Sequence, residues 1–157
     1  MDGDVRFMRM AIDLATSNVV SGAGGPFGAV IVKDGEVVAT GANNVTASND
    51  PTAHAEVTAI RNAAKALGSF ELQGCVIYSS CEPCPMCLGA IYWARCEALY
   101  FAGTAQDAAD AGFDDSFLYD EVRKGIGERS LRTVNLMRDE AGASFKAWEE
   151  FAGRVEY

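Results

Sequence analysis

The sequence predicts a single α/β domain in which helices cover a β-sheet. Segments with helical periodicity alternate with strand-like apolar runs along most of the chain, and this alternation is typical of a layered α/β fold. The length of 157 residues and the apolar content of 49% suit one domain with one core. The sequence shows no internal repeat and no linker rich in proline and serine. We therefore expect residues 1–157 to form one domain.

The first predicted elements are a helix and a β-hairpin. Residues 4–20 repeat apolar side chains at helical spacing, and a glycine-rich segment follows them. Within residues 27–41, two β-rich runs flank the pair Asp34 and Gly35. Asp-Gly between two such runs is the strongest short signal for a hairpin. The two strands should therefore be antiparallel neighbours.

The later elements continue the alternation to the end of the chain. Gly68 follows a helical segment directly, and glycine there is typical of a helix end. The remaining patterns predict a helix over 53–67, a buried strand over 75–80, a helix over 85–95, a strand over 97–103, helical turns within 105–124, a strand over 131–137 and a helix over 144–154.

Charge and hydropathy exclude several classes of partner. Thirteen Lys and Arg residues stand against twenty-two Asp and Glu residues, and the net charge of −9 opposes binding to a polyanion. The chain contains no run of the roughly 20 apolar residues that a membrane helix requires. Its first residues include acids where a secretory signal would carry Lys or Arg. We expect a cytoplasmic protein that binds neither nucleic acid nor membrane.

The cysteines and the single histidine predict a metal site. Three of the five cysteines lie within the seven residues CEPCPMC, which favours a metal over a disulfide framework. We place Cys84 at the cap of the helix that follows and Cys87 in its first turn, while His54 lies at the opening of its own helix. Side chains tilt toward a helix N-terminus, and the partial positive charge there favours thiolate. One histidine and two cysteines would hold zinc and leave a fourth position for water.

Glu56 follows the histidine by two residues and predicts the chemistry of this site. At a helix opening, both side chains can lean over the same end, so Glu56 would lie beside the metal without binding it. A carboxylate there can accept a proton from a water whose pKa the metal lowers. The arrangement indicates hydrolysis.

Simpler interpretations of these residues remain open. A single histidine at a helix start is more often a cap or a surface group, and Glu56 alone would be an acid favoured by the helix dipole. Cys81 could also supply a fourth ligand and create a closed structural zinc site without catalysis. We favour the open site because Cys81 lies outside the predicted helical turn.

Longer segments resemble a known family. HAE at 54–56 and PCPMC at 83–87 match the signature of zinc deaminases. GGPFGAVIVKDG, NNVTASNDPTAHAEVTAIR, SCEPCPMCLGAIYWAR and AGFDDSF are similar to segments of bacterial guanine deaminases, which belong to the cytidine deaminase-like superfamily. The resemblance is weakest at 125–143. It implies a three-layer α/β/α sandwich with a five-stranded mixed sheet, one Zn²⁺ per chain, and hydrolysis of a purine base, guanine, to xanthine and ammonia.

The resemblance also implies a role for each site residue. His54, Cys84 and Cys87 correspond to the zinc ligands, Glu56 to the proton shuttle, and Asp115 to an acid that serves the substrate amino group. The substrate contacts that it implies are Phe27, Asn43, Ala55, Trp93 and Tyr157. An amide can donate to and accept from a purine edge, and aromatic rings can stack on the base.

Several of these residues also have a simpler interpretation. Asp115 could be a solvated acid, Asn43 a turn residue, and Phe27 and Trp93 ordinary core residues. In the resembling enzymes, a terminal tyrosine closes the site of a partner subunit after the C-terminal segment swaps. For this chain, the resemblance therefore implies a homodimer in which residues 144–157 are exchanged. The simpler alternative is a frayed end.

Several related functions stay open at this point. Deamination of guanosine, cytosine or an aminotriazine would use the same metal chemistry, and only the shape of the pocket separates these substrates. A transfer-RNA adenosine deaminase shares the zinc motif, but it should carry a basic surface and tail, whereas this chain ends in EEFAGRVEY.

Overall fold

The computed structural model of the chain describes residues 4–157, which divide into two units. The first unit extends to Ser116 and the second runs from Phe117 to Tyr157. The site residues that the sequence predicts lie in the first unit, with the exception of Tyr157.

The first unit is built on a four-stranded mixed sheet with the strand order β2-β1-β3-β4. β1 pairs antiparallel with β2 and with β3, whereas β3 pairs parallel with β4. The strands are β1 (Gly28–Lys33), β2 (Glu36–Ala42), β3 (Cys75–Cys81) and β4 (Ala98–Gly103). The mixed sheet is confirmed, and it has four strands within the described residues instead of the expected five.

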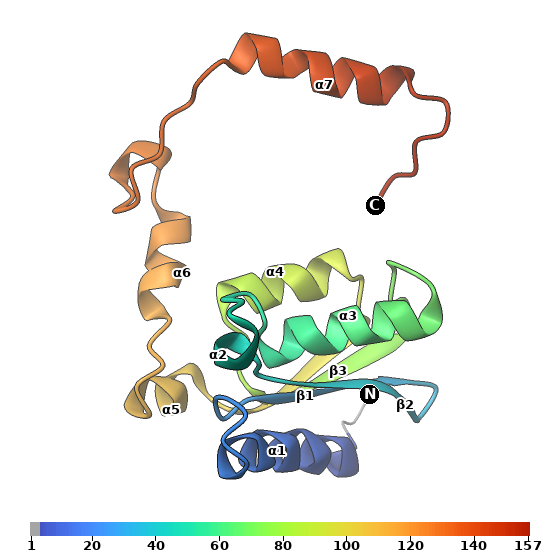
Figure 1. Ribbon diagram of the computed structural model, residues 1–157, viewed down its shortest axis with the longest axis vertical. Helices are drawn as coiled ribbons and strands as arrows, with labels where there is room; N and C mark the ends of the chain where they lie inside the picture. The colour runs from blue at the N-terminus through green and yellow to red at the C-terminus, as the bar shows by residue number, and fades with distance from the viewer. Residues whose placement is uncertain (1–3) are drawn as a thin grey trace. The chain divides into compact units, whose positions relative to one another are not determined.

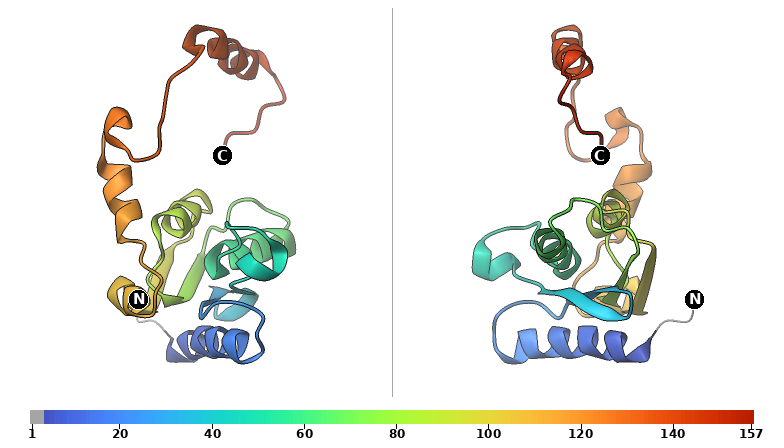
Figure 2. Two further views of the ribbon diagram at one scale, coloured as in Figure 1. Left: turned by 60° about the vertical axis from the view of Figure 1, so that its left-hand side comes forward. Right: turned by 90° about the vertical axis from the view of Figure 1, so that its right-hand side faces the viewer.

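Helices cover both faces of the sheet. α1 (Val5–Val20) lies on one face, and α3 (Ala55–Leu67) and α4 (Pro85–Trp93) lie on the other (Figures 1 and 2). The short helix α2 (Val45–Ser48) follows β2, and α5 (Ala105–Asp110) follows β4. The expected three-layer α/β/α sandwich is therefore confirmed.

Strand β1 shows how the sequence divides the core between the two faces. Ala29 and Ile31 are buried in the cluster that contains the alanines of α3, whereas Val30 and Val32 are buried with Phe7 on the α1 side. Side chains alternate across a strand, so a strand that is apolar at every position is buried on both faces. This explains the continuous apolar run AVIV.

The hairpin between β1 and β2 forms as predicted. Asp34 and Gly35 both adopt positive φ values, 51° and 79°. Two consecutive residues of this kind form the primed turn whose twist matches that of paired strands, and aspartate and glycine adopt it at low cost.

Gly41 determines how closely α3 approaches β2. An added Cβ at Gly41 would lie 2.3 Å from the carbonyl oxygen of Ala55 and 2.4 Å from the backbone nitrogen of Ala59. These are backbone atoms, which a side-chain rotation cannot move away. The helix and the strand are therefore in backbone contact at this position.

We expect Gly41→Ala to lower the free energy of unfolding by about 1–3 kcal/mol, because the new methyl group must push α3 away from the sheet. Denaturant unfolding measures this change. Gly89→Ala is the matched control, since an added Cβ in the middle of α4 meets no atom within 4 Å. That change should be neutral or slightly stabilising, because alanine favours a helix over glycine. Equal stability of the two variants would contradict the predicted contact.

The second unit contains helix α6, which begins at its boundary (Ser116–Arg123), a 3₁₀ turn (Ile126–Glu128) and α7 (Arg138–Glu150). The predicted strand over 131–137 is wrong: these residues form no strand, and Leu136 is 80% exposed. A strand requires a neighbouring strand to which it can bond, which apolar alternation alone does not supply.

The last helix begins earlier than the predicted start at residue 144. α7 starts at Arg138, and Asp139 and Glu140 lie in its first turn, where the helix dipole favours acids. The described part of the chain has no helix that combines the length and hydropathy needed to cross a membrane.

Candidate active site

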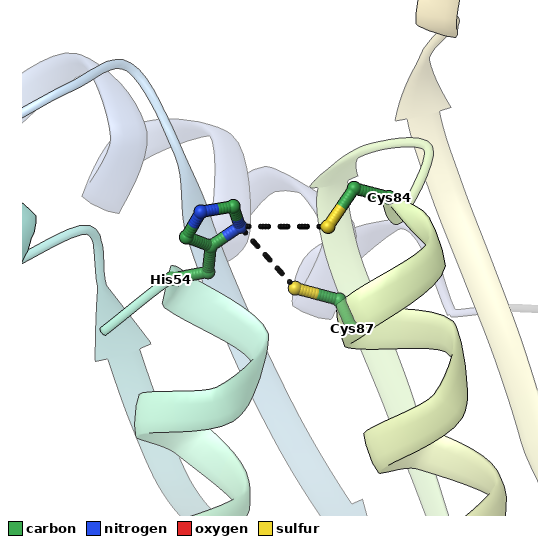
Figure 3. Close-up of side chains that lie close together, drawn as sticks. All are labelled: His54, Cys84 and Cys87. Carbon is green, nitrogen blue, oxygen red and sulfur yellow. Dashed lines mark hydrogen bonds between the residues drawn. The ribbon is translucent and has the colours of Figure 1, made fainter. Parts of the chain in front are cut away.

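Two helix openings meet on the same side of the sheet. α3 begins directly after His54 and α4 directly after Cys84, and Pro85 occupies the first position of α4. Proline suits that position because it has no N–H to leave unpaired. Neither cap side chain bonds its own helix end; instead, the imidazole and the two thiols point toward one another (Figure 3).

The three side chains fit a zinc ion. His54 Nδ1 lies 3.6 Å from Cys84 Sγ and 3.4 Å from Cys87 Sγ, and the three ligand atoms all lie within 4.8 Å of one another. Tetrahedral zinc with ordinary Zn–N and Zn–S bonds separates its ligands by roughly 3.5 Å. The donor set and its spacing therefore match zinc.

The two cysteine thiols shift the pKa of one another in opposite directions. The hydrogen bond from the Cys87 thiol lowers the pKa of Cys84 to about 4, and His54 adds a second hydrogen bond. The same bond to Cys84, together with burial, raises the pKa of Cys87. Cys84 therefore has the thiolate character of a metal ligand, and a metal ion would displace the proton of Cys87.

Glu56 lies beside these ligands in a dry environment. Its side chain is 6% exposed, and the Ser79 hydroxyl donates a hydrogen bond of 3.1 Å to Oε1. Burial is the main cause that raises the pKa of the carboxyl group. A raised pKa makes the carboxylate a stronger base, which favours its role as a proton acceptor.

Ser79 is a residue that the sequence analysis missed. It lies two positions after Ile77 on β3, and Ile77 is buried on the α3 side of the sheet. The alternation of a strand therefore directs the Ser79 hydroxyl to that side as well. A serine at a buried position of an apolar strand is the sequence signal that indicates a role for Ser79.

A cavity of about 660 Å³ opens above the site. Six predicted site residues line it: Phe27, Asn43, His54, Glu56, Cys84 and Asp115. Glycines of the segment 22–25 and residues of α2 form other parts of the wall. The cavity is open enough for a small heterocycle and carries both aromatic and polar groups.

The two acids of the segment FDDSF have different surroundings in the structure. Hydrogen bonds from Ser116 at the start of α6 lower the pKa of Asp114, whereas partial burial raises that of Asp115. Asp114 therefore has a structural partner. Both acids line the cavity, and Asp115 is the one whose pKa is raised.

Phe113 is a second residue that the sequence analysis missed. Its ring meets the ring of Phe27 edge-on, with centroids 5.0 Å apart and an interplanar angle of 88°. Both residues line the cavity. Edge-on contact holds the two rings in a fixed relation.

Three predicted substrate contacts do not line this cavity. Ala55 is fully buried in the core against the sheet, because a residue adjacent to His54 in a helix points to another side. Trp93 is 65% exposed on α4 and Tyr157 is 71% exposed. Their contacts with the substrate stay predictions.

Cys81 lies outside the group that could hold a metal. That group consists of His54, Cys84 and Cys87 within the residues that the structure describes. The Cys81 thiol instead donates to the carbonyl oxygen of Thr104 at 3.6 Å, and burial raises its pKa to about 11. The geometry favours an open site with three protein ligands over the closed alternative.

The family model for the cytidine and deoxycytidylate deaminase zinc-binding region matches residues 1–103. This range contains both helix openings. The chain belongs to this deaminase family. The expectation of a zinc-dependent aminohydrolase is confirmed, and the group of one histidine and two cysteines could bind one metal ion.

Individual members of the deaminase family are similar to the chain to different extents. A guanine deaminase of Bacillus subtilis is 57% identical over 151 residues, which cover 96% of this chain and 97% of the relative. The X-ray structure of guanine deaminase from Bacillus subtilis aligns with a TM-score of 0.96 at 55% identity and covers 99% of both chains. A tRNA-specific adenosine deaminase of Agrobacterium fabrum is 49% identical over 82 residues, about half of each chain.

Proposed function

We propose that the chain hydrolyses guanine to xanthine and ammonia, with His54, Cys84 and Cys87 as the zinc ligands. The observation that carries this proposal is a site with three protein ligands and a buried carboxyl group, Glu56, at the cavity wall. The similarity to a guanine deaminase over nearly the full length supports guanine as the substrate.

In this proposal, Glu56 and Asp115 have different roles in the proton transfers. Zinc bound at the site supplies a water of lowered pKa and an electrophilic centre. Glu56 would accept one proton of the attacking water and deliver it to the ring nitrogen next to C2 of guanine as a C–O bond forms at C2. The second proton of the water would then pass from the C2 oxygen to the amino group, with Asp115 assisting. The C–N bond would break, ammonia would leave, and the C2 carbonyl of xanthine would remain.

The cavity wall would bind the base. Phe27 and Phe113 offer aromatic surface, and the Asn43 amide can both donate to and accept from the purine edge. We also propose that Ala55 and Trp93 contact the base.

We propose a cytoplasmic location as well, because a reducing compartment keeps the cysteine ligands as thiols.

A substrate panel tests the assignment. Ammonia release should be fastest with guanine when the zinc-loaded protein is incubated separately with guanine, guanosine, cytosine, adenine, an aminotriazine and a transfer-RNA anticodon stem-loop. Release from cytosine without release from guanine would overturn the purine assignment. Release from the RNA would instead support the adenosine deaminase alternative, which the net charge of −9 opposes.

We also propose that the chain is a homodimer in which residues 144–157 are exchanged and Tyr157 closes the site of the partner subunit. α6 and α7 contain no buried residue, and apolar side chains such as Phe145 are exposed on α7. Exposed apolar side chains that lie together on a soluble protein usually mark an interaction surface. A second copy of the chain would cover them.

Complementation between two inactive variants tests the exchange. We expect Glu56→Gln and Tyr157→Ala each to be inactive as homodimers, and activity to return when the two chains are refolded together. In the mixed dimer, one site has its own Glu56 and receives Tyr157 from the other chain. If each chain uses its own Tyr157, activity will not return, and a monomer in light scattering would equally contradict the exchange.

A further inference from the structure

Asn18 is a buried amide that the proposed chemistry does not use directly. It lies in the last turn of α1 and is 8% exposed. A buried amide is costly unless its donors are paired, and both N–H groups of Asn18 are paired. Nδ2 donates to the carbonyl oxygen of Gly25 and to that of Asn43, each at 2.8 Å.

The backbone of Asn18 binds the same glycine-rich segment. Its carbonyl oxygen accepts hydrogen bonds from the backbone nitrogens of Ala23 at 3.0 Å and Gly24 at 3.3 Å. The backbone at Gly24 lies so close to residue 43 that no side chain would fit there, because an added Cβ would lie 2.3 Å from the Asn43 carbonyl oxygen. Asn18 therefore fastens α1, the glycine-rich segment and the end of β2 to one another.

The segments that Asn18 joins form part of the cavity wall. Gly24, Gly25 and Asn43 all line the cavity, whereas Asn18 lies behind them. Among the described residues, one long hydrogen bond orients the Asn43 side chain: the backbone nitrogen of Val45 donates to Oδ1 at 3.4 Å. The direction of the Asn43 amide therefore depends on where its backbone is held.

We infer that Asn18 is a positioning residue that holds the backbone of Asn43 and so aims the Asn43 amide at the base. The inference rests on the proposed function, in which Asn43 binds the substrate. Asn18 touches no substrate atom in this arrangement. It acts through the two carbonyl groups that it binds.

Kinetics of Asn18→Ala and Asn18→Leu test the inference. The leucine variant keeps the branched shape of the side chain and removes only its donors. We expect KM for guanine to rise roughly tenfold or more in both variants, because two hydrogen bonds that align the wall are lost. kcat should change less, since the contact with Asn43 contributes to ground state and transition state alike. Zinc content should be unchanged.

Asn62→Ala is the matched control. The Asn62 amide also donates to a backbone carbonyl, that of Thr40 at 2.9 Å, but neither residue lines the cavity. KM should stay at the wild-type value in this variant. A fall in thermal stability of the Asn18 variants with an unchanged KM would overturn the inference and leave Asn18 a structural residue only.

A double-mutant cycle with Asn43→Ala tests whether Asn18 acts through Asn43, independently of whether guanine is the substrate. If Asn18 acts through Asn43, the Asn18→Leu change should raise KM little further once the Asn43 amide is gone. Fully additive effects would overturn the inference while guanine turnover by the wild type still supports the proposed function. The opposite failure, no ammonia from guanine with the wild type, would refute the proposed function itself.

Discussion

Glu56→Gln should retain one zinc per chain and release ammonia from guanine roughly 10²–10⁴-fold more slowly than the wild type, the contribution typical of a positioned general acid or base. The amide keeps the size of the side chain and can still accept the hydrogen bond from Ser79, which the carboxylate receives at 3.1 Å. It cannot take up a proton. Metal analysis and single-turnover ammonia release measure the two properties separately.

Glu71→Gln is the control for this charge change. Glu71 forms an exposed ion pair with Arg95 at 3.6 Å and does not line the cavity. The same neutralisation there should leave the rate unchanged. Turnover that survives in Glu56→Gln would remove Glu56 from the proposed proton transfer.

Cys84→Ala should abolish stoichiometric zinc binding, and ammonia release should fall to background with it. Cys84 contributes one of the three ligand atoms, and two remaining protein ligands do not make a stable zinc site. Zinc per chain after gel filtration in metal-free buffer is the measurement. Partial retention of zinc with normal turnover would show that the metal is held elsewhere.

Cys81→Ala is the matched control, since it removes a thiol only three residues away. The Cys81 thiol bonds the Thr104 carbonyl instead of the imidazole, so zinc content should match that of the wild type. Loss of zinc from this variant would restore the closed site with four protein ligands.

The parts of the fold that could be predicted from sequence depend on local signals. The hairpin at Asp34 and Gly35, the helix end at Gly68 and the helix start at Pro85 follow from the conformational preferences of those residues. The predicted strand over 131–137 was wrong, because pairing is a property of two segments and not of one. The start of α7 at Arg138 was missed for lack of an ordinary N-cap residue.

The residues of the candidate site also differ in whether a local sequence signal marks them. His54, Glu56, Cys84 and Cys87 could be proposed from short motifs at helix starts, and the structure brings them together. Ser79 is indicated only by its buried position on a strand, and no motif marks Asn18, whose amide binds the Asn43 carbonyl 25 residues away in sequence. Such contacts follow from strand alternation and from the position of α1, which only the folded chain defines.

The separation of the proposed metal ligands in the sequence couples metal binding to folding. His54 and Cys84 are 30 residues apart, and strand β3, paired with β1, lies between them in the chain. The unfolded polypeptide therefore holds no preformed pocket for the ion, and folding brings these side chains together. Because an ion that binds the native state in preference shifts the equilibrium toward that state, zinc would stabilise the folded chain.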